Sequence, residues 1–179
     1  ISTNGYQNTA VGSSALRSNT TGIDNTATGY QALYSNTTGG LNTATGNRAL
    51  YSNLGGNYNA ATGDYSLNFN ATGSENAAYG LYALYSNVGG NNSTALGVRS
   101  MQYANNTAAS FTTYNVAIGY EALRGSVTAA NNTGIENTAL GYQTLFSNTN
   151  SSRNTAVGNK SLYSNTATSA NIAMGDSAL

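Results

Sequence analysis

Small, apolar and polar side chains recur along the chain with a fixed phase. The string Asn-Thr-Ala-x-Gly, or a close variant of it, returns ten times between residues 8 and 179, every 17 residues except for two intervals of 22. Counted from the first residue of the string, the third position is always Ala and the fifth always Gly. The ninth is Leu in nine copies and Met101 in the other. Such invariance within one chain indicates a structural requirement that is met once per repeat.

A unit of 17 residues is too short for a helical-hairpin repeat, which needs about 33 residues, and fits one turn of a β-solenoid. We therefore expect an all-β parallel solenoid, or β-roll, of about ten turns that forms a single domain over residues 1–179. Two short strands are expected in each turn, at positions two to four and eight to ten. Because strand side chains alternate between faces, Ala and Gly at positions three and five should face inward, and positions two and four outward. The ninth-position leucines should form a buried column, and the glycines should meet a positive φ or a close backbone approach.

The Ser-Asn-Thr-Thr-Gly stretch that follows is predicted to be the outer turn of the solenoid. Both long repeats are extended beyond the ninth position, around residues 105–111 and 127–132, where surface loops tolerate insertions. Asn-x-Ser/Thr triplets recur in phase in this stretch. They predict accessible glycosylation acceptors in a secreted eukaryotic or archaeal protein, at Asn19, Asn36 and Asn70.

The composition argues against several function classes. Only 7% of the residues are charged, six basic residues balance six acidic ones, and there is no His and no Cys. The basic residues are scattered along the sequence, so we predict no nucleic-acid partner and no binding to an anionic membrane. No apolar run reaches the roughly 18 residues of a membrane span, so no membrane insertion is expected. Because the acidic residues are also scattered, we predict no catalytic residue, no metal site and no cofactor, and expect that the chain is not an enzyme.

Aromatic side chains recur at the tenth position of the repeat. Turns stacked at about 4.8 Å would place them in a ladder. Such a ladder can contact sugar rings, or it can pack between turns or chains and stiffen the rod, and both interpretations stay open. The residues are Tyr34, Tyr51, Tyr85, Phe146 and Tyr163.

The second and fourth positions leave an apolar face on the outside of a single solenoid. Apolar side chains such as Val116, Ile118 and Leu140 occupy it in the second half of the chain. That face packs most simply on the same face of other chains. We therefore predict a homo-oligomer whose axis is parallel to the solenoid.

Residues 115–123 and 171–178 resemble the head repeats of trimeric autotransporter adhesins, which also recur in bacteriophage tail fibres. The two strings read Asn-Val-Ala-Ile-Gly-Tyr-Glu-Ala-Leu and Asn-Ile-Ala-Met-Gly-Asp-Ser-Ala. The resemblance covers all ten repeats, although the adhesin repeat is shorter than the one in this chain. It implies a left-handed β-roll that assembles as a parallel homotrimer and is displayed on a cell surface or virion fibre to bind host or matrix glycans.

We therefore predict an extracellular structural segment of a surface fibre, an adhesin head or a phage tail fibre. The sequence stops at Leu179, the ninth position of its last repeat, without the polar cap of a solenoid end, so we expect an excerpt of a longer fibre that continues end to end. Two alternatives remain. An ice-binding solenoid would use the Thr-x-Thr strings at residues 26–28 and 43–45, although this pattern fails in later repeats. A polysaccharide-degrading tailspike would need a carboxylate cluster.

Overall fold

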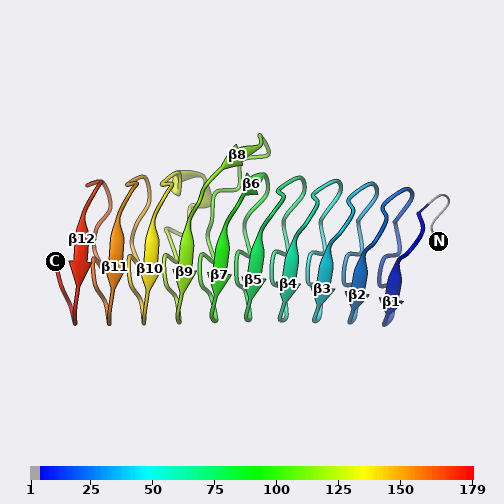
Figure 1. Cartoon of the computed structure of the whole chain (residues 1–179), viewed down its shortest axis with the longest axis horizontal. Helices are drawn as coiled ribbons and strands as arrows, with labels where there is room; N and C mark the ends of the chain where they lie inside the picture. Colours follow the sequence, from blue (N-terminus) through cyan, green and yellow to red (C-terminus); the bar gives the residue numbers. More distant parts are fainter. Residues whose placement is uncertain (1–4) are drawn as a thin grey trace.

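The chain folds as a rod of stacked turns (Figure 1). The structure is a computed structural model that describes residues 5–179, so the first four residues of the predicted domain lie outside it. Ten short strands form one parallel sheet in the order β1-β2-β3-β4-β5-β7-β9-β10-β11-β12. These strands are β1 (Thr9–Val11), β2 (Thr26–Thr28), β3 (Thr43–Thr45), β4 (Ala60–Thr62), β5 (Ala77–Tyr79), β7 (Thr94–Leu96), β9 (Val116–Ile118), β10 (Thr138–Leu140), β11 (Thr155–Val157) and β12 (Ile172–Met174). The predicted all-β parallel solenoid of about ten turns is confirmed, and the left-handed sense that the resemblance implies stays a prediction.

Each strand pairs with the same repeat positions in the neighbouring turns. Ala27 in β2 lies opposite Ala10 on one side and Ala44 on the other, and this register continues to β12. The central alanine of strands β2 to β11 is fully buried, while the residues on both sides of it are exposed or half-buried. The predicted inward and outward faces are therefore confirmed for this strand. Thr, Val and Ile on the outward side favour the extended backbone because branching at Cβ suits a pleated surface.

The ninth-position leucines form the predicted buried column, but no strand accompanies them. Leu33, Leu50, Leu67 and Leu84 are all fully buried. Gln31 and Leu33 have φ angles of 55° and 49°, in the left-handed region, and the same two positions repeat this conformation in every turn from Ser14 on. The expected strand at positions eight to ten is therefore wrong. Hydrogen bonds between turns persist without it, since the Leu33 amide donates to the Ala49 carbonyl over 3.0 Å.

The fifth-position glycines all have a positive φ, and all of them except Gly175 in the last turn also lie close to the backbone of the next turn. Gly80 has a φ of +133°, and a Cβ added to it would lie 2.6 Å from the carbonyl oxygen of Gly97 in the next turn. Such a contact is shorter than van der Waals packing permits, and the atoms that cause it belong to the backbone. Each turn can therefore stack on the next at this corner only if the residue has no side chain.

The stretch predicted as an outer turn is only partly outside. Its Asn and its Gly point into the rod, whereas the two residues between them lie at or near the surface; Asn36 and Gly39 are buried, and Thr38 is exposed. Asn36 donates from Nδ2 to Asn19 Oδ1 over 2.8 Å and to the Gly39 carbonyl over 2.9 Å. This arrangement repeats from Asn19 to Asn87 and forms an asparagine ladder that we call the turn ladder.

A second asparagine ladder runs beside the first and is built from the first position of the repeat. Asn42 donates from Nδ2 to Asn25 Oδ1 over 3.1 Å and to the Gly56 carbonyl over 2.8 Å. Gly56 also accepts from Asn53 of the turn ladder, and one glycine carbonyl joins the two ladders in this way in each turn from Gly22 to Gly90. The interior is therefore apolar at Ala and Leu and hydrogen-bonded at two asparagines per turn, which satisfies polar groups that would otherwise be costly to bury.

The two insertions bulge from the stack without interrupting it. The first forms a small parallel pair between β6 (Gly90–Asn91) and β8 (Phe111–Thr112), and Figure 1 shows β8 projecting beyond the other turns. The second contains a short 3₁₀ helix at Ala129–Asn131. Strands β7, β9 and β10 still pair in register across both insertions, as the sequence predicted.

Candidate functional site

The predicted glycosylation acceptors lie inside the rod. Asn19 is 1% exposed, and Asn36 and Asn70 are fully buried. The Nδ2 atoms of Asn36 and Asn70 each donate two hydrogen bonds, one to the previous asparagine of the turn ladder and one to a glycine carbonyl. The accessibility predicted for these residues is therefore wrong. Their regular phase reflects an interior ladder, and the folded rod has no room for a sugar at these nitrogens.

The five aromatic residues predicted as a ladder form two stacked pairs and one separate cluster. The rings of Tyr34 and Tyr51 are stacked with centroids 5.1 Å apart, and those of Phe146 and Tyr163 with centroids 4.9 Å apart. The next turn after Tyr51 places the buried Asn68 at this position, so the first pair ends there. Tyr85 has no stacked partner and meets the rings of Phe69 and Tyr82 edge-on.

Stacking leaves few open ring faces on these pairs. One face of Tyr34 packs against Tyr51, and the guanidinium of Arg17 lies 5.5 Å from the Tyr34 ring centre. Arg48 lies 5.4 Å from the ring centre of Tyr51 in the same way. The Tyr34 hydroxyl also accepts a hydrogen bond from Arg17 Nη1 over 2.7 Å. A sugar that contacts these pairs would therefore meet edges, hydroxyls and cations more than ring faces.

A second column, at the seventh position, lies beside the tenth and was missed in the sequence. Tyr65 and Tyr82 stack in it with ring centres 5.3 Å apart, and Tyr82 also contacts Tyr85 of the tenth position. Because a solenoid turn brings positions seven and ten to one side, we call these two columns the aromatic face. The same repeat phase that revealed the tenth-position ladder could have revealed this column.

The aromatic face also collects most of the basic residues. Five of the six occupy position seven or ten: Arg17, Arg48, Arg99, Arg124 and Lys160. Each of them except Arg99 lies over an aromatic ring at 5.0–5.7 Å from the ring centre. The basic residues are scattered along the sequence, as stated above, but the fold gathers five of the six on one side of the rod.

A single carboxylate accompanies these cations. Glu121, at the seventh position, is 8% exposed in its side chain and lies between Arg99, at 3.5 Å, and Arg124, at 3.6 Å. Its other carboxylate oxygen accepts a hydrogen bond from Gln143 Nε2 over 2.8 Å. None of the other five acidic residues occupies either column: two lie at position six of their repeats and three at the last position. The aromatic face thus carries five basic groups against one acidic group.

The phenol of Tyr85 does not add negative charge to this face. Burial, together with the neighbouring Tyr82, raises the pKa of the Tyr85 hydroxyl above its usual value near 10. A raised pKa keeps the phenol neutral to higher pH than in water.

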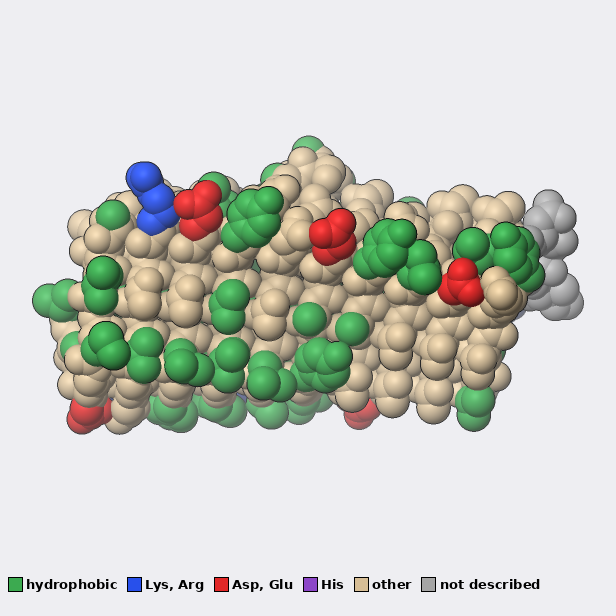
Figure 2. Space-filling view, viewed as in Figure 1, with side chains coloured by type: hydrophobic (Ala, Val, Ile, Leu, Met, Phe, Trp, Pro, Cys, Tyr) green, Lys and Arg blue, Asp and Glu red, His purple; other side chains and the backbone are tan. Residues whose placement is uncertain are grey.

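The outward side of the main sheet, which we call the sheet face, changes character along the rod. In β2 and β3 it carries the Thr-x-Thr pairs, and the pattern ends there. From β5 on, the fourth position carries Tyr79, Leu96 and Leu140, each more than 40% exposed, and Met174, which is 70% exposed. Figure 2 shows hydrophobic side chains in a row along the half of the rod that carries β5 to β12. A second apolar row follows at the sixth position: Leu81, Val98, Tyr120 and Tyr142.

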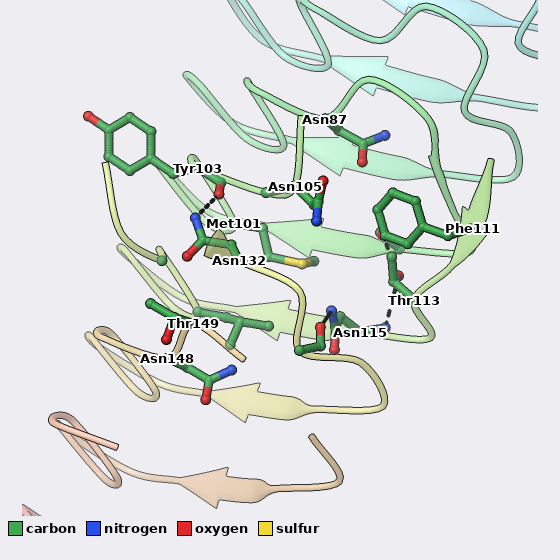
Figure 3. A pocket seen from close by; sticks show the side chains of 15 residues that line it. Asn87, Met101, Tyr103, Asn105, Phe111, Thr113, Asn115, Asn132, Asn148 and Thr149 are labelled. Carbon is green, nitrogen blue, oxygen red and sulfur yellow. Dashed lines mark hydrogen bonds between the residues drawn. The ribbon is translucent and has the colours of Figure 1, made fainter. Parts of the chain in front are cut away.

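A small pocket opens where the insertions interrupt the turn ladder. The turn after Asn87 has Ala104 at the ladder position, and Asn87 Oδ1 is buried with no hydrogen-bond partner among residues 5–179. Figure 3 shows the Met101 side chain reaching into the space between Asn87 and Asn148. The pocket has a volume of about 30 Å³. That is room for one or two water molecules and too little for an organic ligand.

Across residues 5–179 there is no group of three or more acidic, His or Cys side chains that could hold a metal ion. Within the same residues there is also no helix with the length and apolar content of a membrane span. The surfaces that remain as candidates are the aromatic face and the sheet face.

Comparison of the chain with known protein families gives no match, and comparisons with curated proteins and with solved structures give none either. The likeness of its repeats to adhesin heads and tail fibres therefore stays a resemblance of short strings. Any function has to be argued from the geometry of the rod.

Proposed function

We propose that the chain is a structural segment of an extracellular fibre or adhesin, on a cell surface or a virion, and that it assembles as a parallel homotrimer. The observation that carries this proposal is the exposed apolar half of the sheet face. Soluble monomers rarely expose large contiguous apolar patches, and such patches mark interaction sites. The straight repeat geometry supports an extended, rod-like role.

A second copy of the same chain is the occupant that fits this face best. The face is a flat, regular array with one pair of outward residues every turn, so an identical array can meet it along the whole rod. The whole sheet face, ten turns at about 4.8 Å and five residues at about 3.3 Å, has a footprint near 800 Å², of which the six turns of the apolar half make up about 480 Å². One side of a standard protein interface also buries about 800 Å². A closed ring of parallel chains, each contributing the same face, leaves no apolar row in water.

Glycan contact is the second part of the proposal, and it uses the aromatic face. This face lies around the corner from the sheet strands, so a chain that packs through its sheet face keeps the aromatic face available. The stacked pairs Tyr34–Tyr51 and Phe146–Tyr163 stiffen this side of the rod. The fibre would then hold a binding surface away from the cell or virion.

Charges placed in the apolar rows test the assembly. The double substitution Leu96→Lys and Leu140→Lys should convert the trimer into monomers, because paired chains would have to bury like charges. Sedimentation equilibrium should give three times the chain mass for the wild type and one chain mass for the variant. Circular dichroism should show that the β structure is kept, since both leucines are 42–47% exposed.

A matched control places the same two charges elsewhere. Thr38→Lys and Thr72→Lys change exposed threonines of the turn stretch and should leave the trimer intact. A wild-type chain that is monomeric at every concentration, or a trimer that the leucine substitutions leave unchanged, would contradict the proposed assembly.

A further inference from the structure

We infer that the aromatic face binds an acidic polysaccharide, with the basic residues of positions seven and ten along its track. This inference deepens the proposed glycan contact and rests on it, because it names the class of glycan and the residues that select it. The basic groups that carry the argument are Arg48, Arg99, Arg124 and Lys160. They lie on one side of a straight rod, whereas no such concentration exists on the sheet face, where Figure 2 shows hardly any basic side chains.

The spacing of these cations suits a linear chain with charges at intervals. With turns about 4.8 Å apart, Arg48 lies about 14 Å from Arg99 along the axis, and Arg124 lies about 10 Å from Lys160. These separations equal or exceed the Debye length of about 8 Å at physiological ionic strength. Arg48 and Lys160 therefore attract separate anionic groups, whereas Arg99 and Arg124, one turn apart, share the Glu121 carboxylate between them. Affinity comes from several weak contacts along one ligand.

The groups around the cations favour a sugar chain. The eleventh position borders this face with serine hydroxyls at Ser35, Ser52 and Ser86, which are half-buried. Phenols and the side chain of Gln31, which accepts from Arg48 Nε over 2.8 Å, add further polar groups. Hydroxyls and amides can exchange hydrogen bonds with sugar hydroxyls between the charged contacts.

The same geometry disfavours a nucleic acid. Proteins that hold single strands stack successive bases on open aromatic faces. In the aromatic face, the stacked rings cover one another, and Arg17 and Arg48 cover further faces of the Tyr34–Tyr51 pair. A nucleic acid also carries a phosphate about every 3.4 Å per strand, far denser than this row of cations.

The arginines keep an orientation that serves binding. Arg48 lies between Tyr51, at 5.4 Å, and Tyr65, at 6.0 Å, and Arg124 lies between Tyr103, at 5.1 Å, and Phe146, at 5.0 Å. A guanidinium held over a ring keeps its N–H edge for other partners, because the ring contacts only its flat side. Sulfate and carboxylate groups accept hydrogen bonds from that edge in pairs.

The test measures binding of the whole 179-residue chain to four polymers by biolayer interferometry. Heparin and polygalacturonate supply sulfate and carboxylate groups, neutral dextran lacks charge, and oligo-dT supplies phosphates with bases. We expect binding to at least one of the two acidic polysaccharides, weakening with added NaCl, and little or none to dextran and oligo-dT. Equal binding of dextran, or binding of oligo-dT as tight as that of the acidic polysaccharides, would overturn the inference.

Charge variants locate the track. Arg48→Gln together with Lys160→Gln should weaken polysaccharide binding by roughly fivefold, since an exposed ion pair contributes about 0.2–1 kcal/mol. Arg48→Lys together with Lys160→Arg keeps both charges and should keep most of the binding. Arg153→Gln removes the one basic residue outside the aromatic face, at the seventeenth position, and should leave binding unchanged. An equal loss with Arg153→Gln would show that only net charge matters and would contradict the inference.

Sedimentation of the same samples separates this inference from the proposed assembly. A trimer that binds no acidic polysaccharide would overturn the inference and leave the fibre segment standing. A monomer whose binding depends on Arg48 and Lys160 would contradict the trimer and leave the inference standing.

Discussion

Replacing Gly80 with alanine is expected to destabilise the rod by about 2–6 kcal/mol. The new Cβ would lie 2.6 Å from the Gly97 carbonyl oxygen, and no side-chain rotation can relieve this contact because the backbone fixes the positions of both atoms. Overpacking of this kind costs about 1–3 kcal/mol. The φ of +133° adds a further cost of about 1–3 kcal/mol for a residue with a side chain. Urea denaturation followed by circular dichroism, at one fixed protein concentration, measures the loss.

Gly175 offers a matched control for this substitution. It has nearly the same φ, +127°, but a Cβ added to it meets nothing within 4 Å. Gly175→Ala should therefore show only the cost of the backbone conformation, about 1–3 kcal/mol. If the two substitutions have equal effects, close stacking of turns is not the reason for glycine at this position.

Replacing Asn53 with alanine is expected to cost about 2–4 kcal/mol, because it removes one rung of the turn ladder. Asn53 Nδ2 donates to Asn36 Oδ1 over 2.7 Å, and Asn53 Oδ1 accepts from Asn70 Nδ2 over 2.9 Å. Without Asn53, the buried Asn36 oxygen has no donor, and each unsatisfied group costs about 1–3 kcal/mol. The same denaturation experiment measures this loss, and an effect below about 0.5 kcal/mol would contradict the structural role of the ladder.

Asn53→Asp keeps the shape of the side chain and adds a dependence on pH. The introduced carboxyl would face two acceptors, Asn36 Oδ1 and the Gly56 carbonyl, in a buried site, so its folded-state pKa should rise above the unfolded value near 3.9. The variant should therefore be closest to the wild type below about pH 4. It should lose stability as the pH rises from there through the raised pKa. Asn106→Asp, in the exposed first insertion, should lack this dependence.

The repeat phase was enough to predict the sheet, the inward alanines, the leucine column and the glycine corner. All of these depend on a requirement that recurs in every turn and is visible as an invariant residue. The second strand was predicted wrongly because positions seven and nine adopt left-handed φ angles with residues such as Gln31 and Leu33. Nothing in those side chains favours that conformation, which costs roughly 1–2 kcal/mol per residue and is sustained by the stacking of turns.

The asparagine ladders were missed because asparagine and glycine are the usual residues of exposed turns. In this rod, asparagine and glycine recur at the repeat positions of Asn36 and Gly39 for an interior reason. The asparagine side chain donates hydrogen bonds inside the rod to the glycine carbonyl and to the asparagine of the previous turn. The case for assembly rests on the exposed apolar rows of the sheet face.

The aromatic face was half predicted. The tenth-position ladder was visible as a repeated Tyr, but the seventh position varies among Ser, Gln, Arg, Tyr, Glu and Lys, and such variation hides a column. Only the stacking of turns brings Arg48 beside Tyr51 and Tyr65, and Arg124 beside Phe146. The row of basic residues becomes visible in the sequence when each charged residue, like each apolar one, is assigned its position in the repeat.

Cross-linking of single cysteines tests the parallel assembly through the sheet face most directly, because the chain has no cysteine of its own. Thr43→Cys and Thr138→Cys place thiols at the same repeat position in β3 and β10, on exposed sites. In a parallel trimer, each variant alone should be joined to itself by a short bis-maleimide. Failure of both variants to cross-link, or cross-linking only after the two are mixed and reassembled, would contradict the parallel sheet-face trimer.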